Sequence, residues 1–225
     1  MKCLSFFFIA LLFAGCPNTD EPGNSMAHLA RQFFVPIPGS ALYDWTHQDE
    51  RPGKTDSLYT VTYIGNDVKR SVDDISPVYL FQVTTVKDAT PHTFQNEYCI
   101  TDSVVVSYGA SAASDAERMI LLRDTLRLGK KWQAASVFKT SDGVSTSIEA
   151  EIDAYYASIH IGTKDYFDVY RVTYRPIAQT STVDIAYRFG ARHIYYYARN
   201  VGKVMEIVYG ADSLLVWKNE LVLEH

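Results

Sequence analysis

The chain has 225 residues and a formal net charge of −5, and 47% of its residues are hydrophobic. This length and composition are typical of one globular domain with a sizeable core. The acidic balance and the absence of a Lys/Arg cluster argue against a nucleic-acid partner. With 16 Tyr and 11 Phe, the composition favours strands over helices.

A short apolar stretch follows Lys2 at the N-terminus. The run Leu4–Ala14 has about eleven residues, the length of a secretory signal core. It is too short for the roughly 20 residues of a transmembrane helix. The stretch ends in Phe13-Ala14-Gly15-Cys16, which resembles the lipobox of bacterial lipoproteins.

The lipobox resemblance implies that residues 1–15 form a signal peptide, cleaved between Gly15 and Cys16, and that Cys16 carries acyl chains. Two or more chains hold a protein stably on a membrane, whereas one chain does not. The expected location is therefore the bacterial cell envelope, lipid-anchored at the outer membrane, with the domain in the periplasm or on the surface. An ordinary signal peptide with an incidental Cys16, or a buried N-terminal strand, remains the alternative.

The segment 16–31 is polar and is interrupted by Pro17, Pro22 and Gly23. Such a segment buries too little apolar surface to fold, so it predicts a flexible tether. We expect a single β-rich domain over residues 32–225.

The cysteines allow no intrachain disulfide in this scheme. Cys3 leaves with the signal peptide and Cys16 is acylated, so Cys99 remains alone. Because Cys99 lies in a predominantly apolar stretch of sequence, we interpret it as a small buried core residue rather than as a nucleophile.

Apolar runs with a period of two residues predict antiparallel strands along the rest of the chain. The clearest alternation occurs in Ile148–Ala154 and Val183–Phe189. Further strands are predicted at Leu58–Ile64, Val78–Val86, Val104–Tyr108, Met119–Leu122, Trp132–Phe138, Phe167–Tyr174, Ile194–Ala198, Val204–Tyr209 and Leu214–Trp217. Turns are expected at Gly65–Asp67, Ser141–Gly143 and Gly210–Asp212, and Ser111–Arg118 has the composition of a helix or a loop. The predicted fold is mainly β, an antiparallel meander of about ten strands that forms a curved half-barrel or a lipocalin-like barrel with little helix.

Four local patterns occur in order: Pro38-Gly39 before Trp45, Leu126–Trp132, Ile161–Tyr170 and Tyr196–Val204. Together they resemble a broad group of bacterial envelope lipoproteins of unknown function, with domains similar to the half-barrel or lipocalin-like sheets of lipoprotein carriers. The resemblance spans about residues 33–210 and implies a fold but no catalytic residues.

Within these patterns we interpret the glycines as positions of positive φ or close backbone approach. The three tryptophans, Trp45, Trp132 and Trp217, are interpreted as large core residues.

The sequence contains no HExxH, CxxC, GxSxG or P-loop pattern, so we expect neither an enzyme nor a cofactor. His47 lies near Asp44, Asp49 and Glu50, which could form a metal site. Because Asp44 and Thr46 alternate away from His47 in a strand, a solvated strand end is favoured and no metal site is predicted.

The remaining histidines, His92, His160 and His193, are interpreted as surface or satisfied core residues. The acidic side chains Glu149, Glu151 and Asp153 share one strand face, which could bind a cation but more commonly faces solvent.

Two functions remain. The first is a binding module whose curved sheet holds a lipid or another hydrophobic ligand. The alternative is a structural or protein-interaction lipoprotein with a filled core. The expected partners are the membrane, through acyl chains on Cys16, and a hydrophobic small molecule or an envelope protein. The ligand-binding residues are not identified by the sequence.

Overall fold

The computed structural model describes residues 29–34, 40–54, 56–71, 77–87, 90–108, 118–123, 126–139, 145–177, 192–210 and 212–224. The predicted signal peptide, Cys16 and nearly all of the tether lie outside these residues. So do the predicted strand Val183–Phe189, the turn Ser141–Gly143, and all of Ser111–Arg118 except its last residue. In the described part of the chain, no helix is long and apolar enough to cross a membrane.

The fold is mainly antiparallel β, as predicted. It begins with one short 3₁₀-helix, η1 (Ala30–Phe33), so the first described element starts two residues before the predicted boundary at Gln32. The strands are β1 (Ser40–Asp49), β2 (Ser57–Ser71), β3 (Pro77–Lys87), β4 (Thr90–Ile100), β5 (Val104–Ser107), β6 (Met119–Arg123), β7 (Lys131–Lys139), β8 (Ser145–Ile161), β9 (Lys164–Ile177), β10 (Arg192–Ala198), β11 (Gly202–Tyr209) and β12 (Leu215–Glu224).

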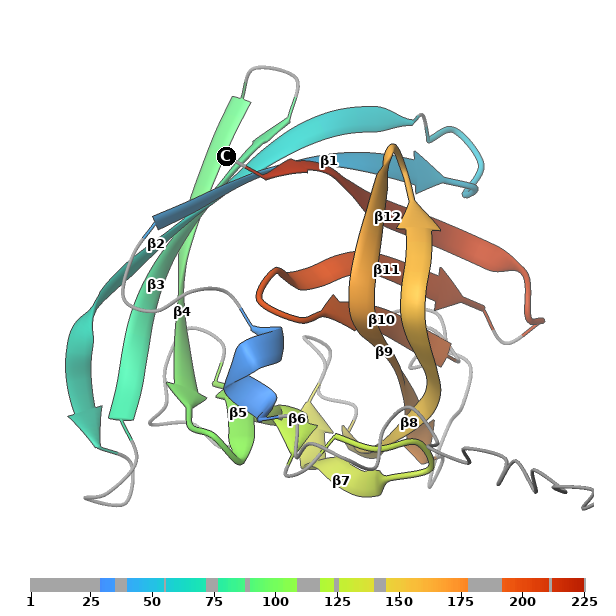
Figure 1. Ribbon diagram of the computed structural model, residues 1–225. Helices are drawn as coiled ribbons and strands as arrows, with labels where there is room; N and C mark the ends of the chain where they lie inside the picture. Colours follow the sequence, from blue (N-terminus) through green and yellow to red (C-terminus); the bar gives the residue numbers. More distant parts are fainter. Residues whose placement is uncertain are drawn as a thin grey trace, which may run out of the picture.

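These strands form one twelve-stranded curved sheet in the order β6-β5-β4-β3-β2-β1-β12-β11-β10-β9-β8-β7 (Figure 1). Strands that follow one another in the chain pair with each other, except β6 and β7, and β1 also pairs with β12. The antiparallel meander is therefore confirmed, and the described residues alone contain twelve strands rather than about ten.

The two halves of the sheet face each other across η1. Phe33 of η1 packs edge-on against Tyr170 of β9, with ring centroids 5.3 Å apart. The next residue, Phe34, contacts Tyr98 of β4 at 5.0 Å. We call the face that carries Tyr98 and Tyr170 the inner face. Figure 1 shows η1 inside the curve of the sheet.

The two end strands of the sheet, β6 and β7, are also connected. Trp132 Nε1 on β7 donates a hydrogen bond to the Ile120 carbonyl on β6 at 3.0 Å. The hydroxyl of Tyr174 on β9 donates to the Leu121 carbonyl of β6 at 2.5 Å. These side chains draw the two ends of the sheet toward each other.

The structure corrects three predictions. Strand β1 was predicted only as a strand end at Asp44–His47, and only the last few residues of β4 were noted as strand-like, because both strands are rich in polar residues with low β-propensity. No turn occurs at Gly65–Asp67, since β2 continues through it with a shift in register. The turn at Gly210–Asp212 is confirmed as the start of the β11–β12 hairpin, where Gly210 N donates to the Leu214 carbonyl at 2.9 Å.

Most of the predicted core residues are buried. Trp45 and Trp132 are 3% and 5% exposed, while Trp217 is only partly buried. Cys99 is buried on the outer face of the sheet in a cluster with Val78, Val106 and Tyr108, which confirms its core role.

Positive φ angles occur at three glycines of the predicted patterns, whereas the fourth, Gly39, lies outside the described residues. Gly129 precedes β7, Gly162 lies in the β8–β9 turn and Gly202 begins β11, with φ values of 78°, 62° and 99°. The interpretation of these glycines as backbone positions is confirmed.

Candidate functional site on the inner face

Four neighbouring strands place a polar cluster on the inner face of the sheet. His47 of β1 pairs with Asn219 of β12, and Asn219 pairs with Glu206 of β11. Glu206 in turn pairs with Tyr195 of β10. Because side chains alternate between the two faces of a strand, residues paired in this way share one face. The cluster therefore depends on strand register rather than on a local motif.

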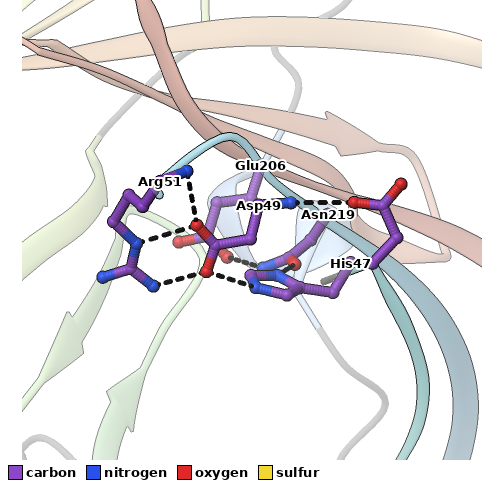
Figure 2. A network of polar contacts seen from close by, with 6 residues as sticks. His47, Asp49, Arg51, Glu206 and Asn219 are labelled. Atoms are coloured by element: carbon purple, nitrogen blue, oxygen red, sulfur yellow. Dashed lines mark hydrogen bonds and ion pairs between the residues drawn. The ribbon is translucent and has the colours of Figure 1, made fainter. Parts of the chain in front are cut away.

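Asp49 lies at the end of β1 and is 8% exposed. Arg51 donates to its carboxylate through Nε at 2.8 Å, through Nη2 at 2.6 Å and through the backbone N–H at 3.1 Å. These contacts are visible in Figure 2. The hydrogen bonds from Arg51 hold the pKa of Asp49 well below its usual range, although burial acts in the opposite direction.

His47 joins Asp49 to the rest of the cluster. Its Nδ1 lies 2.6 Å from Asn219 Oδ1, and its Nε2 lies 3.4 Å from Asp49 Oδ2. The side chain is 17% exposed. The prediction of a solvated strand end at His47 is therefore wrong. The predicted alternation is right, since Asp44 accepts a bond from Thr60 while Thr46 is exposed.

Glu206 is a second buried charge of the cluster, at 7% exposure. Its carboxylate contacts His193 Nε2 at 2.5 Å, Lys203 Nζ at 2.7 Å and Asn219 Nδ2 at 3.4 Å. Burial alone would raise the pKa of Glu206. Lys203 and His193 outweigh burial and hold this pKa well below its usual value.

The Asn219 amide has a defined orientation. Its Nδ2 donates to Glu206, so its Oδ1 is the atom that accepts from His47. A carbonyl oxygen only accepts, which means that His47 Nδ1 carries the hydrogen. The amide thus links Glu206 to His47 through two hydrogen bonds (Figure 2).

Aromatic rings surround the charges. Lys203 Nζ lies 4.7 Å from the ring centroid of Tyr195 and 5.7 Å from that of Trp45. Trp217 packs between the two histidines, with centroids 5.5 Å from His193 and 6.1 Å from His47. The cluster is therefore both ionic and aromatic.

Tyrosine hydroxyls near the cluster lie in surroundings of low polarity. Burial, followed by the nearby Glu206 carboxylate, raises the pKa of Tyr195 well above its usual value. Burial is also the main cause of the raised pKa of Tyr174 and Tyr197. The side chains of Tyr174 and Tyr197 therefore lie in the interior, since both residues are almost fully buried.

The other predicted candidates do not join this cluster. His92 and Glu50 are exposed, and His160 pairs with Asp165 on the surface at 2.8 Å. Among the described residues, no group of three or more His, Cys, Asp or Glu side chains is arranged to hold a metal ion.

The acidic side chains Glu151 and Asp153, which share one face of β8, form ion pairs with neighbouring cations and are not simply exposed to solvent. Asp153 accepts from Arg171 Nε at 2.7 Å and from Thr173 at 2.8 Å. Glu151 lies 3.4 Å from Lys131 Nζ and 3.5 Å from Arg175.

Sequence reasoning missed four members of the cluster, Arg51, Lys203, Glu206 and Asn219. His193 was interpreted as a surface or satisfied core residue, and it is a largely buried residue paired with Glu206. One signal was present, because Glu206 interrupts the apolar run from Val204 to Val208 in β11. A charge in such a strand is expected to have partners, yet the sequence does not show which ones.

No family model matches this chain, and no curated protein matches it. Solved structures do. A Bacteroides fragilis NCTC 9343 protein, provisionally described as exported and with a YmcC-like fold, is 12% identical with a TM-score of 0.52. The alignment covers 86% of this chain and 99% of that one.

Two further structures are similar at a TM-score of 0.41. One is a protein from Parabacteroides distasonis ATCC 8503, provisionally described as a lipoprotein, which is 10% identical over 86% of this chain and 99% of its own. The other is a β-barrel-like protein of domain of unknown function DUF1849 from Brucella abortus, 14% identical over 85% and 98%. At these identities the comparisons concern the fold, and they assign no family.

Proposed function

We propose that this chain is a lipid-anchored protein of the bacterial cell envelope, placed at the outer membrane, and that its inner sheet face binds a hydrophobic or amphipathic small molecule. The anchor follows from Leu4–Ala14 and the lipobox-like ending at Cys16. Export is also in keeping with the description of the Bacteroides fragilis protein that shares the fold. The role is binding rather than catalysis.

One observation carries the binding proposal. The aromatic side chains Tyr59, Tyr98, Tyr195 and Trp217 lie on the inner face, yet each is only partly buried. Aromatic surface that faces inward and remains accessible is suited to contact with an apolar ligand. The cluster beside it supplies polar groups that can orient the ligand.

The ionic cluster itself favours binding over hydrolysis. Asp49 and Glu206 are both held by cations and amides, with Arg51 and Lys203 as their direct partners. A carboxylate kept ionised in this way has a low pKa and is a poor general base at neutral pH. The alternative function, a structural or protein-interaction lipoprotein, requires that the inner face take up no ligand.

Binding can be measured by titrating an apolar fluorescent dye against the purified protein. We expect saturable binding by the wild-type chain and a loss of at least tenfold in affinity for Trp217→Ala. Phe167→Ala, which removes an aromatic ring that is 65% exposed, is the matched control and should bind as the wild type does. Equal binding by both variants would show that the dye does not bind at Trp217, and no binding by the wild type would support the structural alternative.

The anchor is tested separately with Cys16→Ser. The wild-type chain should incorporate palmitate and partition into detergent, and the variant should do neither. Palmitate incorporation by the variant would show that Cys16 is not the acylated residue.

A further inference from the structure

An irregularity in β11 turns Lys203 onto the inner face. The register between β10 and β11 shifts between Tyr196 and Tyr197, and Tyr197 pairs with Lys203. A β-bulge of this kind changes the direction of the side chains next to it. Lys203 Nζ accordingly lies 4.7 Å from the ring centroid of Tyr195 on the inner face. The Lys203 side chain is 29% exposed, so a ligand on this face can reach it.

Lys203 has more hydrogen-bond donors than the cluster uses. An ammonium group carries three N–H donors. One of them is directed at Glu206 Oε2, at 2.7 Å. Among the described residues, the other contacts of Nζ are with the aromatic rings of Tyr195 and Trp45. The ammonium group therefore retains donors for an oxygen atom of a ligand.

Trp45 supplies a further donor in the same neighbourhood. It pairs with Tyr59 on the inner face and is 3% exposed. Its Nε1 has no hydrogen-bond partner in the described part of the chain, and Lys203 Nζ lies 5.7 Å from its ring centroid. A buried N–H without a partner is unfavourable, and an indole N–H can only donate. An acceptor that enters beside Lys203 would relieve this cost.

The carboxylates of the cluster are already paired. Asp49 accepts from Arg51 Nη2 at 2.6 Å, and Glu206 accepts from Lys203 Nζ at 2.7 Å. The polar capacity that remains beside Lys203 and Trp45 consists of donors. A complementary ligand therefore presents an acceptor oxygen at this place.

The charges of the same groups disfavour an ionised ligand. Each of the two carboxylates has one cation at hydrogen-bond distance, so the charges are matched. A ligand carboxylate on Lys203 would lie close to the ionised Glu206, and burial strengthens the repulsion between them. A ligand ammonium would repel Lys203 and find both carboxylates of the cluster already paired. A neutral acceptor oxygen avoids both conflicts.

We propose that the inner face selects a neutral acyl ester. Its carbonyl oxygen accepts hydrogen bonds from Lys203 Nζ and Trp45 Nε1, and its acyl chain lies against the neighbouring aromatic side chains. This inference rests on the proposed function and names the ligand class: an uncharged ester lipid rather than a free fatty acid or an amine.

The test uses four probes that carry the same saturated chain and differ at its end: methyl laurate, laurate, dodecylamine and dodecane. Each is measured by displacement of the apolar dye from the wild-type chain at neutral pH. We expect methyl laurate to bind about tenfold more tightly than dodecane, because its carbonyl oxygen receives hydrogen bonds that the alkane cannot accept. Laurate and dodecylamine should both bind more weakly than methyl laurate.

Two variants assign the donors. Lys203→Met and Trp45→Phe each remove a donor and keep an apolar side chain. The ratio of the affinity for methyl laurate to that for dodecane should fall in both. Lys218→Met, at a lysine on the outer face, and Trp132→Phe, at a tryptophan of β7, are the matched controls and should keep the wild-type ratio.

The wild-type chain separates this inference from the proposed function. If the chain binds the dye and dodecane but binds methyl laurate no more tightly, or prefers laurate, the ester is not selected and the proposed function stands. If the chain binds neither the dye nor any probe, both are wrong. An ester preference that survives in both Lys203→Met and Trp45→Phe would contradict the donors assigned above.

Discussion

Asp49 contributes stability in a way that depends on pH. Its folded pKa lies below that of an unfolded Asp, because Arg51 stabilises the carboxylate. A group with a lowered folded pKa stabilises the protein above its unfolded pKa, about 4, and this contribution is lost as the pH falls further. Arg51 is itself 44% exposed, so solvent weakens the Coulomb part of the pair and the hydrogen bonds matter more.

We therefore expect Asp49→Asn to lower the free energy of unfolding by about 2 kcal/mol at neutral pH. The difference from the wild type should shrink as the pH is lowered below about 4. Urea denaturation at several pH values measures both effects. Asp165→Asn, at a carboxylate that is 62% exposed, is the control and should change stability little. A pH-independent deficit for Asp49→Asn would contradict the assigned pKa direction.

The position of η1 between the two halves of the sheet rests on few residues. Phe33 is fully buried against Tyr170, and Ala30 N donates to the Asp102 carbonyl at 2.8 Å. At the other end, Asn200 N donates to the Gln32 carbonyl at 2.5 Å. The helix thus links the β4–β5 turn to the β10–β11 turn.

Phe33→Ala should cost about 3–5 kcal/mol, because it removes a buried ring that the surrounding sheet cannot easily replace. The change should appear as a lower urea midpoint. Phe167→Ala, at an exposed ring, should stay within about 0.5 kcal/mol of the wild type. If the two variants were equally stable, η1 would not be packed inside the sheet as described.

The β8–β9 hairpin reaches β12 through its turn. Gly162 has φ 62°, and a Cβ at this position would lie 3.3 Å from the Leu221 carbonyl oxygen. Gly53 has a similar φ of 74° in the β1–β2 turn, but a Cβ there would meet nothing within 4 Å.

Both Gly162→Ala and Gly53→Ala should lose about 1–2 kcal/mol from the left-handed backbone. Gly162→Ala should lose more, because its methyl group also presses on β12. Comparison of thermal midpoints separates the two contributions. A smaller loss for Gly162→Ala than for Gly53→Ala would show that the hairpin turn does not pack closely on β12.

At the scale of the whole molecule, the sequence predicted the fold class but not the site. The apolar runs of β3 and β11 and the alternating apolar residues of β8 are local signals, so these strands could be predicted. Strand β4 contains Pro91, Asn96 and Glu97, which weaken that signal.

The site depends on information that no local pattern contains. His47, His193, Glu206 and Asn219 come from four strands, and they meet only because β1 pairs with β12. A shift of one residue in any of these pairings would turn the side chains to the outer face. His47 shows the consequence, since its neighbours in sequence suggested solvent whereas its partners across the sheet bury it.

The central claim is that the inner face carries a ligand. Native mass spectrometry of the full chain, purified in mild detergent from its own membrane, tests this most directly. The account predicts a species heavier than the acylated chain by the mass of an apolar or amphipathic molecule, which organic extraction releases. A population with the mass of the acylated chain alone, unchanged by extraction and by incubation with lipid, would contradict it.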